Sequence, residues 1–483
     1  MNLCNINHNF NYELEKLCRI FLPFEKISVL DEVKEDTIYA VCKIDGDFAS
    51  AKLVFEDKEY VKTEKAEDDS LKSKELALAA SLYKCFVEAT GYKPEWGLLT
   101  GVRPAKLYGK LINTIGQNDT DRYFSEKLYV SDEKIKLCRE TVLPEQAIIN
   151  KSSRNSFSLY VSIPFCPSRC SYCSFVSHSV EKAQGLIDDY ITLLCKEIVE
   201  TAKIAKQQNL GLETVYIGGG TPVAVSADQL KLVMDTIKEN FELSLVSEYT
   251  VEAGRPDAID EEKLRVIKEG GATRISVNPQ TMNDSVLKAI GRNHTALQTI
   301  EAFNLARKVG FNNINMDLIA GLPTDTTEGF KFSLDTLLDL DPESITVHSL
   351  SVKRASNMQR DNLLPEVENG KMASEMVRYA KTTLTQKGIV PYYMYRQSKT
   401  VGNHENVGYA KSGFEGLYNV YIMDETHTIL ALGASAVTKL RQPGGENISR
   451  IFNFKYPYEY ISRFNEIIDR KTGISDFYAK YPI

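Results

Sequence analysis

Three cysteines stand close together in the stretch SIPFCPSRCSYCSF, residues 162–175. Cys166, Cys170 and Cys173 follow a C-x3-C-x2-C pattern, so a single loop presents three thiols. Three thiolates are one ligand short of a closed tetrahedral zinc site or of an iron–sulfur cubane held by protein alone. The pattern therefore predicts a metal centre in which one position is left open.

Three interpretations of these thiols compete. A chance cluster of buried thiols is disfavoured, because residues between them such as Ser168 and Arg169 are not core residues. A structural zinc site would need a fourth ligand, for which His178 is the neighbouring candidate. An iron–sulfur cubane with three protein ligands and one iron free for a small molecule is favoured. The other cysteines are scattered and are predicted to be small buried hydrophobes: Cys4, Cys18, Cys42, Cys85, Cys138 and Cys195.

Polar residues end several strand-like runs further along the chain. GGGTP, Gly218 to Pro222, offers backbone bare of side chains, whose N–H and C=O groups can meet a ligand's amino and carboxylate groups. Glu252, Gln280 and Asp317 end three further runs, and Arg292 offers a guanidinium for a carboxylate. Ligands gather at the carboxyl ends of parallel strands. We therefore expect a polar ring around one opening beside the three thiols.

The elements that must position these residues alternate between strands and helices from Phe157 onward. The expected strands are FSLYVSIPF, TVYIGGG, EYTVEAG, RISVNPQ, NINMDLIAG and SITVHSLS. Amphipathic helices are expected between them, around 182–206, 227–240, 260–269, 283–309 and 327–340. Strands that are apolar on both faces indicate a parallel sheet covered by helices. Six such units predict an α/β fold, a partial (β/α)6 TIM-like barrel that is open on one side.

The flanking regions have a different texture, and three domains are expected, at 1–150, 151–365 and 366–483. The first is an α+β unit with a hairpin around Asp45-Gly46-Asp47 and a helix from about Lys74 to Thr90. The polar stretch NKSSRNS, 150–156, marks the first boundary. The last domain is expected to be α+β, with a helix at about 370–388, strands at PYYMYR, YNVYIMD and THTILALG, and a helix near 457–470.

Composition sets limits on function. The chain has 483 residues and a formal net charge of -7, the wrong sign for a surface that grips a phosphate backbone, so no nucleic-acid partner is expected. The N-terminus has no basic segment followed by an apolar one, so it does not resemble a signal peptide. No run of apolar residues reaches the length of a membrane span. A cytoplasmic protein with reduced thiols is therefore expected.

Several motifs carry a family resemblance. CPSRCSYC, GGGTP, VEA, NPQ and MDLIAGLP together resemble radical S-adenosylmethionine (SAM) enzymes of the oxygen-independent coproporphyrinogen III oxidase family. WGLLTGVRPAK, ITVHSLSVKRAS and PYYMYRQ look most like its HemZ branch, usually called coproporphyrinogen dehydrogenase. The resemblance covers roughly residues 157–440. It is highly specific for the cofactor chemistry and much less so for the substrate.

The resemblance implies a [4Fe-4S] cluster held by Cys166, Cys170 and Cys173, with S-adenosylmethionine as the missing fourth ligand. One electron from the reduced cluster cleaves the sulfonium, and the resulting 5'-deoxyadenosyl radical abstracts hydrogen from the substrate. Family residues that hold one or two S-adenosylmethionine molecules match Tyr172, Gly219, Gly220, Thr221, Glu252, Gln280, Arg292, Asp317 and Ser351. Tyr160 matches a tyrosine at the active site, where it is a catalytic and cofactor-binding candidate. A reductase, flavodoxin or ferredoxin is implied as the electron donor.

The implied substrate, coproporphyrinogen III, carries four carboxylates, and two of them are converted to vinyl groups to give protoporphyrinogen IX in anaerobic heme biosynthesis. An acidic protein must collect positive charge locally to bind it. The candidates are Lys353, Arg354 and Arg396, followed by Arg103 and Lys106.

The chain departs from the oxidase pattern in three places. Phe175 stands where the oxidase has a further cysteine, SVNPQ replaces a usual glycine–valine pair, and the first 150 residues have no counterpart. Loss of that cysteine is also a trait of relatives that traffic heme, so a heme-binding chaperone is the rival function. An RNA-modifying radical enzyme is a third possibility, disfavoured by the acidity of the chain.

Overall fold

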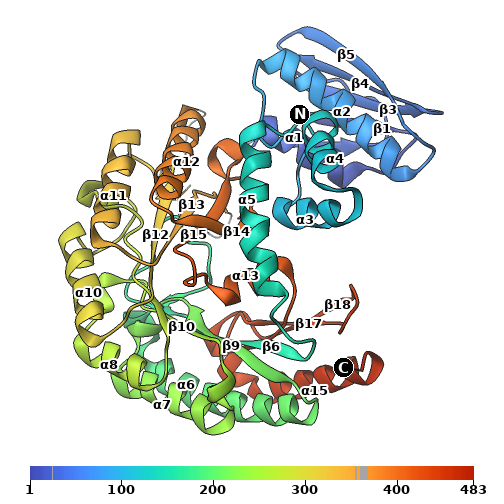
Figure 1. The fold of residues 1–483 in the computed structure, drawn as a ribbon. Helices are drawn as coiled ribbons and strands as arrows, with labels where there is room; N and C mark the ends of the chain where they lie inside the picture. The colour runs from blue at the N-terminus through green and yellow to red at the C-terminus, as the bar shows by residue number, and fades with distance from the viewer. Residues whose placement is uncertain (24, 354–355, 359–367, 483) are drawn as a thin grey trace. The chain divides into compact units, whose positions relative to one another are not determined.

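The chain folds into two compact units. The computed structural model describes residues 1–23, 25–353, 356–358 and 368–482 (Figure 1). One unit comprises Met1–Glu140 and Arg396–His404, and the other comprises Thr141–Tyr395 and Glu405–Ile483. The helix α5, Asp132–Ile149, runs across the first boundary. The three-part division expected at residues 150 and 365 stays a prediction.

The first unit is built on a sheet with the strand order β2-β1-β3-β4-β5. Its strands are β1 Asn2–Ile6, β2 Ser28–Leu30, β3 Tyr39–Asp45, β4 Phe48–Phe55 and β5 Lys58–Lys65. The expected hairpin is present, because Asp45 pairs with Phe48 across a turn in which Gly46 has a φ of 62°. Its helices are α1 Asn11–Phe21, α2 Leu71–Thr90, α3 Pro104–Ile115 and α4 Gln117–Arg122, followed by a π-helical turn at Tyr123–Lys127.

The second unit contains the predicted parallel strands. β6 Ser156–Ile163, β9 Gly211–Gly219, β10 Glu248–Glu252, β11 Arg274–Ser276, β12 Ile314–Ala320 and β13 Ser344–Ser349 pair in this order, each parallel to the next. Most of their residues are buried, as expected of strands covered on both faces. The partial six-unit barrel is therefore confirmed.

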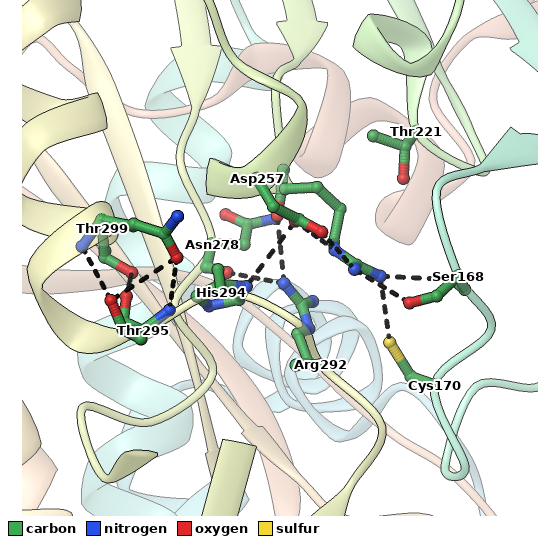
Figure 2. A network of polar contacts seen from close by, with 12 residues as sticks. Ser168, Cys170, Thr221, Asp257, Asn278, Arg292, His294, Thr295 and Thr299 are labelled. Atoms are coloured by element: carbon green, nitrogen blue, oxygen red, sulfur yellow. Dashed lines mark hydrogen bonds and ion pairs between the residues drawn. The ribbon is translucent and has the colours of Figure 1, made fainter. Parts of the chain in front are cut away.

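Helices follow each of these strands and form an outer layer (Figure 1). They are α6 Val180–Gln207, α7 Ala227–Asn240, α8 Glu261–Glu269, α9 Asp284–Ala289, α10 Ala296–Val309, α11 Thr327–Leu340 and α12 Glu368–Gln386. The segment expected as one helix at 283–309 is two, because the chain turns at Gly291, where φ is 76°. The intervening loop carries Arg292 and His294 toward the thiols, and this break therefore matters for the site (Figure 2).

The outer edges of the six strands pair with later strands rather than with each other. β13 pairs antiparallel with β15, Glu405–Ala410, and β6 pairs parallel with β16, Thr428–Leu432. The full order among the described residues is β14-β15-β13-β12-β11-β10-β9-β6-β16-β17-β18. The added strands are β14 Val390–Arg396, β17 Val437–Arg441 and β18 Ile448–Phe452. The C-terminal helices are α14 Pro457–Ser462 and α15 Phe464–Lys480.

One C-terminal prediction is wrong. YNVYIMD, expected as a strand from its aromatic and β-branched residues, lies in the helix α13, Leu417–Asp424. The carboxylate of Glu248, on β10, accepts hydrogen bonds from the backbone N–H groups of Leu417 (2.7 Å) and Tyr418 (3.2 Å). Because these are donors that the first turn of a helix leaves unpaired, the tertiary contact stabilises the helix against the local preference.

Candidate active site

The three thiols lie in the loop that follows β6. β7, Phe165–Cys166, pairs with β8, His178–Ser179, and this short ladder closes the base of the loop. Cys166 and Cys170 are buried and Cys173 is half-buried. The N–H of Cys173 donates to the carbonyl of Cys170 (3.2 Å), which tightens the turn between them. All three thiols therefore belong to one ordered loop at the carboxyl end of the first barrel strand.

Burial makes the thiols of Cys166 and Cys173 reluctant to ionise. It raises the pKa of Cys166 and raises that of Cys173 to about 11. A bound cation is therefore needed to hold them as thiolates at neutral pH. Across the described ranges, no group of three or more His, Cys, Asp or Glu side chains gathers closely enough to hold a metal ion. His178, the candidate zinc ligand, instead places its ring 6.2 Å from that of Tyr456.

The thiol loop is anchored to two neighbouring loops of the barrel. Ser171 donates its N–H to the carbonyl of Ile290 (3.0 Å), and Ser168 donates its hydroxyl to the carbonyl of Gly291 (3.3 Å). From the other side, Arg255 donates to Ser168 and to the sulfur of Cys170. The loop is therefore placed by the segments that follow β10 and β11.

The glycine turn after β9 packs directly against the thiol loop. A Cβ on Gly220 would lie 2.6 Å from the carbonyl oxygen of Phe165 and 3.0 Å from the sulfur of Cys166. Gly219 has a φ of 108°, which side chains disfavour. The N–H of Gly220 donates to the carbonyl of Ile163, and the N–H of Thr221 donates to the carbonyl of Phe165. These two hydrogen bonds hold the turn in place. The Thr221 hydroxyl donates to the sulfur of Cys166 (3.5 Å).

Tyrosine rings and a carboxylate lie together on the inner side of the sheet. The ring of Tyr160, on β6, lies 6.2 Å from that of Tyr216 on β9 and 6.1 Å from that of Tyr418 on α13. Tyr216 donates its hydroxyl to Glu252 (2.5 Å). Burial, together with nearby Asp317, raises the pKa of Glu252 to about 7, although the hydrogen bond from Tyr216 acts to lower it. Glu252 is therefore poised between its two protonation states near neutral pH.

The pKa of Asp317 is shifted in the opposite direction to that of Glu252. Its carboxylate accepts a hydrogen bond from Asn315 (2.7 Å) and lies 3.6 Å from His348. Although burial raises the pKa of Asp317, these two partners hold it below its ordinary value. Burial lowers the pKa of His348, but Asp317 raises it above its ordinary value. The two adjacent carboxylates, Glu252 and Asp317, are thus pushed toward different protonation states, as in sites that use one acid and one base.

Gln280 and Arg292 lie in the segments that follow β11. Gln280 has a φ of 71°. Its N–H donates to the backbone carbonyl of Asp317 (2.9 Å), and its backbone carbonyl accepts from the N–H of Ile319 (3.0 Å). The guanidinium of Arg292 donates to the carbonyls of Gly254 (3.3 Å) and Asn278 (3.0 Å), and to the hydroxyl of Tyr172 (3.1 Å). The structure therefore brings Arg292 and Tyr172 together, two residues far apart in sequence.

Five polar side-chain atoms in these segments have no hydrogen-bond partner among the described residues. They are the side-chain oxygens of Asn278 and Gln280, the Nε of Arg292 and both ring nitrogens of His294, all buried. Buried polar groups are normally satisfied, so an unsatisfied cluster indicates a missing polar ligand. An amino acid group or a nucleoside supplies donors and an acceptor of the required kinds.

The residues proposed to bind the substrate carboxylates do not all belong to the compact unit that holds the thiols. Arg103, Lys106 and Arg396 belong to the first compact unit. There the Arg396 guanidinium donates to Leu99 and to Asn403 (2.8 Å) and lies over the ring of Trp96. Lys353 is half-buried, and Arg354 is outside the described residues. Substrate contacts by these residues stay predictions. Ser351, predicted as an S-adenosylmethionine contact, lies just after β13, and this role also stays a prediction.

Several residues of the site were not found from the sequence. Tyr216 and His348 lie on predicted strands, and their inward direction was available from the alternation along β9 and β13. Arg255 and Asn278 follow β10 and β11 directly, so the rule that ligands gather at strand ends pointed to them as well. Tyr418 had no such signal, because its helix was predicted as a strand.

Comparisons with known proteins agree with this geometry. The model of the Radical SAM superfamily matches residues 160–337. The oxygen-independent coproporphyrinogen-III oxidase-like protein HemZ of Bacillus subtilis (strain 168) is 39% identical over 386 residues, covering 79% of this chain and 77% of that protein. The chain belongs to the oxygen-independent coproporphyrinogen III oxidase family of radical SAM proteins.

A further relative and a solved structure extend the comparison. The heme chaperone HemW of Bacillus subtilis (strain 168) is 36% identical over 284 residues, covering 57% of this chain and 70% of that protein. The solved coproporphyrinogen III oxidase HemN of Escherichia coli matches with a TM-score of 0.52 and 24% identity, covering 66% of this chain and 72% of that chain. This structural likeness establishes the fold alone. The two curated relatives are thus named as an oxidase-like protein and as a heme chaperone.

Membership of the radical SAM family implies a [4Fe-4S] cluster and S-adenosylmethionine, and the residues present fit both. The donor set is three thiols on one loop, each of which would bind a different iron. Gly220 leaves room beside Cys166 that a side chain would fill. The unsatisfied polar atoms of Asn278, Gln280 and Arg292 lie in the segments that dock on this loop or follow the neighbouring strand.

None of the helices in the described ranges has a stretch both long and apolar enough to cross a lipid bilayer.

Proposed function

We propose that this protein converts two propionate groups of coproporphyrinogen III to vinyl groups, giving protoporphyrinogen IX by radical SAM chemistry. The observation that carries the proposal is that the thiol loop, Glu252, Gln280 and Asp317 all lie toward the carboxyl ends of the parallel strands. The 39% identity with an oxidase-like relative along most of both chains supports the choice of substrate.

The binding roles follow from the donor types. Cys166, Cys170 and Cys173 bind three irons of the cluster. Near them, the turn at Gly219, Gly220 and Thr221 holds the methionine end of S-adenosylmethionine through its carbonyls and the close approach that glycine permits. When bound, the cluster and S-adenosylmethionine supply a one-electron cleavage that ends with removal of a hydrogen atom from the substrate.

The remaining site residues place the nucleoside and the substrate. The unsatisfied atoms of Gln280 and Arg292, with Tyr172 beside them, bind polar groups of S-adenosylmethionine. Glu252 and Asp317 accept hydrogen bonds from its amino or hydroxyl groups. Tyr160 lies on the inner face, where its ring excludes water and contacts the bound molecules.

Each propionate loses carbon dioxide, one hydrogen atom and one electron, and the electron passes to an external acceptor. A reductase, flavodoxin or ferredoxin supplies the electron that reduces the cluster. The substrate is bound through cationic side chains that pair with its carboxylates. Lys353 remains a candidate within the second unit.

The test is an anaerobic assay with reconstituted protein, a reductant, S-adenosylmethionine, coproporphyrinogen III and an electron acceptor. Methionine, 5'-deoxyadenosine and carbon dioxide are the expected products. Cys170→Ala should abolish cluster binding and cofactor cleavage, and Cys195→Ala, which changes a half-buried thiol outside the loop, is the matched control that should retain both. Arg292→Ala should keep the cluster and bind S-adenosylmethionine more weakly. Wild-type protein that holds the cluster but releases no carbon dioxide contradicts the proposal.

A second candidate function is heme delivery, and two observations favour it. The chain is 36% identical to a heme chaperone over part of its length. Phe175, where the oxidase has a further cysteine, exposes 68% of its surface and is available for a partner or a heme. Stoichiometric heme binding without turnover of coproporphyrinogen III would establish this function in place of decarboxylation.

A further inference from the structure

Arg255 is a buried cation beside the thiol loop that has no part in the roles assigned above. It follows β10, exposes only 3% of its surface, and contacts both the loop and Asp257. A buried arginine is costly unless every donor has an acceptor. The arrangement of its partners therefore indicates what it stabilises.

The five N–H groups of its guanidinium all have acceptors. Nε and Nη2 donate to the two carboxylate oxygens of Asp257 (2.9 and 2.8 Å). Nη1 donates to the carbonyl of Ser168 (3.2 Å) and to the sulfur of Cys170 (3.6 Å), and Nη2 also donates to the hydroxyl of Ser168 (3.0 Å). Three of the five bonds thus go to the thiol loop, and one goes to a sulfur that would bind iron.

Asp257 fixes the orientation of the Arg255 guanidinium. It lies in the short helix Pro256–Ala258, and its bidentate contact allows the guanidinium one orientation. Although burial raises the pKa of Asp257, Arg255 holds it below its ordinary value, and the carboxylate stays ionised. His294 lies 3.8 Å from the same carboxylate, and burial lowers the pKa of His294 to about 3, so its ring adds no positive charge.

We propose that Arg255 raises the reduction potential of the cluster through its N–H···S bond to Cys170 and its positive charge. This inference rests on the proposed function, because it requires a cluster on the three thiols. Electron uptake makes the cluster and its thiolates more negative, so a hydrogen bond and a positive charge at Cys170 stabilise the reduced state more than the oxidised state. Hydrogen bonds to sulfur and nearby charge are established controls of iron–sulfur potentials.

A purely structural role is the alternative, since Arg255 also anchors Ser168. Three variants separate the two. Arg255→Gln removes the charge and keeps much of the side-chain volume. Arg255→Lys keeps the charge but lacks the planar, bidentate guanidinium. Ser168→Ala removes one anchor of the loop and leaves the bond to Cys170. Arg265→Ala, which removes an exposed arginine of α8, is the control for loss of an arginine that does not contact the thiol loop.

The measurement is a redox titration of the reconstituted proteins under anaerobic conditions, followed by the electron paramagnetic resonance signal of the reduced cluster, with iron and sulfide content measured in parallel. At the wild-type midpoint, Arg255→Gln should lower the ratio of reduced to oxidised cluster about tenfold or more, where tenfold is about 59 mV for one electron. Arg255→Lys should lower it less. Ser168→Ala and Arg265→Ala should leave it unchanged.

Two outcomes overturn the inference. One is a wild-type reduction potential in Arg255→Gln. The other is a reduction potential in Ser168→Ala that falls as far as that in Arg255→Gln. If Arg255→Gln takes up no iron, Arg255→Lys decides: a lowered potential supports the inference and a wild-type potential overturns it. Wild-type protein that takes up no cluster removes the proposed function and this inference together. An active wild type with unshifted variants removes the inference alone.

Discussion

Glu252 should make the unliganded protein less stable as the pH rises, and replacing it should remove this effect. Its carboxyl is buried beside Tyr216 and Asp317, and its pKa is raised from 4.5 to about 7. A raised carboxyl pKa means that the folded protein holds this proton more tightly than the unfolded chain does. The resulting stability is fully present below pH 4.5 and is lost as the pH rises through about 7.

The size of the effect follows from the shift. A difference of one pKa unit corresponds to about 1.4 kcal/mol, so a rise from 4.5 to about 7 corresponds to at most about 3 kcal/mol. Glu252 retains some exposure, and solvent reduces this figure, so we expect about 1–3 kcal/mol. Glu252→Gln keeps an acceptor for the Tyr216 hydroxyl and cannot ionise. It should therefore match the wild type near pH 5 and be more stable near pH 8.

The assay is thermal unfolding of cofactor-free protein between pH 5 and pH 8, with Glu328→Gln, which changes an 83%-exposed side chain, as the control. The melting temperature of Glu252→Gln should exceed that of the wild type by a few degrees at pH 8 only. The same variant should bind S-adenosylmethionine more weakly, since the ionised carboxylate is the better acceptor. A difference in melting temperature that is constant across this pH range would refute the electrostatic reasoning.

Two further predictions concern the glycine turn beside the thiol loop and a buried ion pair. Gly220→Ala should reduce the iron content after reconstitution, because its Cβ would lie 3.0 Å from the sulfur of Cys166 and overpacking costs about 1–3 kcal/mol. Gly185→Ala, where a Cβ meets nothing within 4 Å, is the control. Equal iron contents in the two variants would contradict the prediction. Glu197→Gln should lower the melting temperature, because it leaves the buried ammonium of Lys471, 3.0 Å away, without its counter-charge at a cost of about 3–5 kcal/mol. An unchanged melting temperature would show that this pair is not a net source of stability.

The strands of the barrel were predictable because each is a short apolar run bounded by turn residues. Burial on both faces leaves this mark on a sequence whatever the surrounding structure is. The thiol loop was predictable for a related reason, since three ligands from one loop must be close in sequence. Gly46 illustrates the same point in the first unit, because a tight hairpin depends on residues that are adjacent in the chain.

Elements that depend on distant partners were not predictable. α13 is helical because Glu248, from another part of the chain, binds its first N–H groups. The break between α9 and α10 occurs at Gly291, whose place is beside the thiol loop rather than within a continuous helix. In α13, a long-range contact therefore outweighed the local preference for a strand.

The amino-acid sequence alone determined the succession of strands and helices, the three-thiol loop, and the polar residues that end the strands, because these features depend on neighbours within a few residues. Only the tertiary structure decided which of those residues meet. It joined Arg292 to Tyr172, Glu252 to Tyr216, and Arg255 to Cys170. The physical reason is that hydrogen bonds and charge interactions act over a few ångströms in space, and segments far apart in the chain come that close only when the sheet has formed.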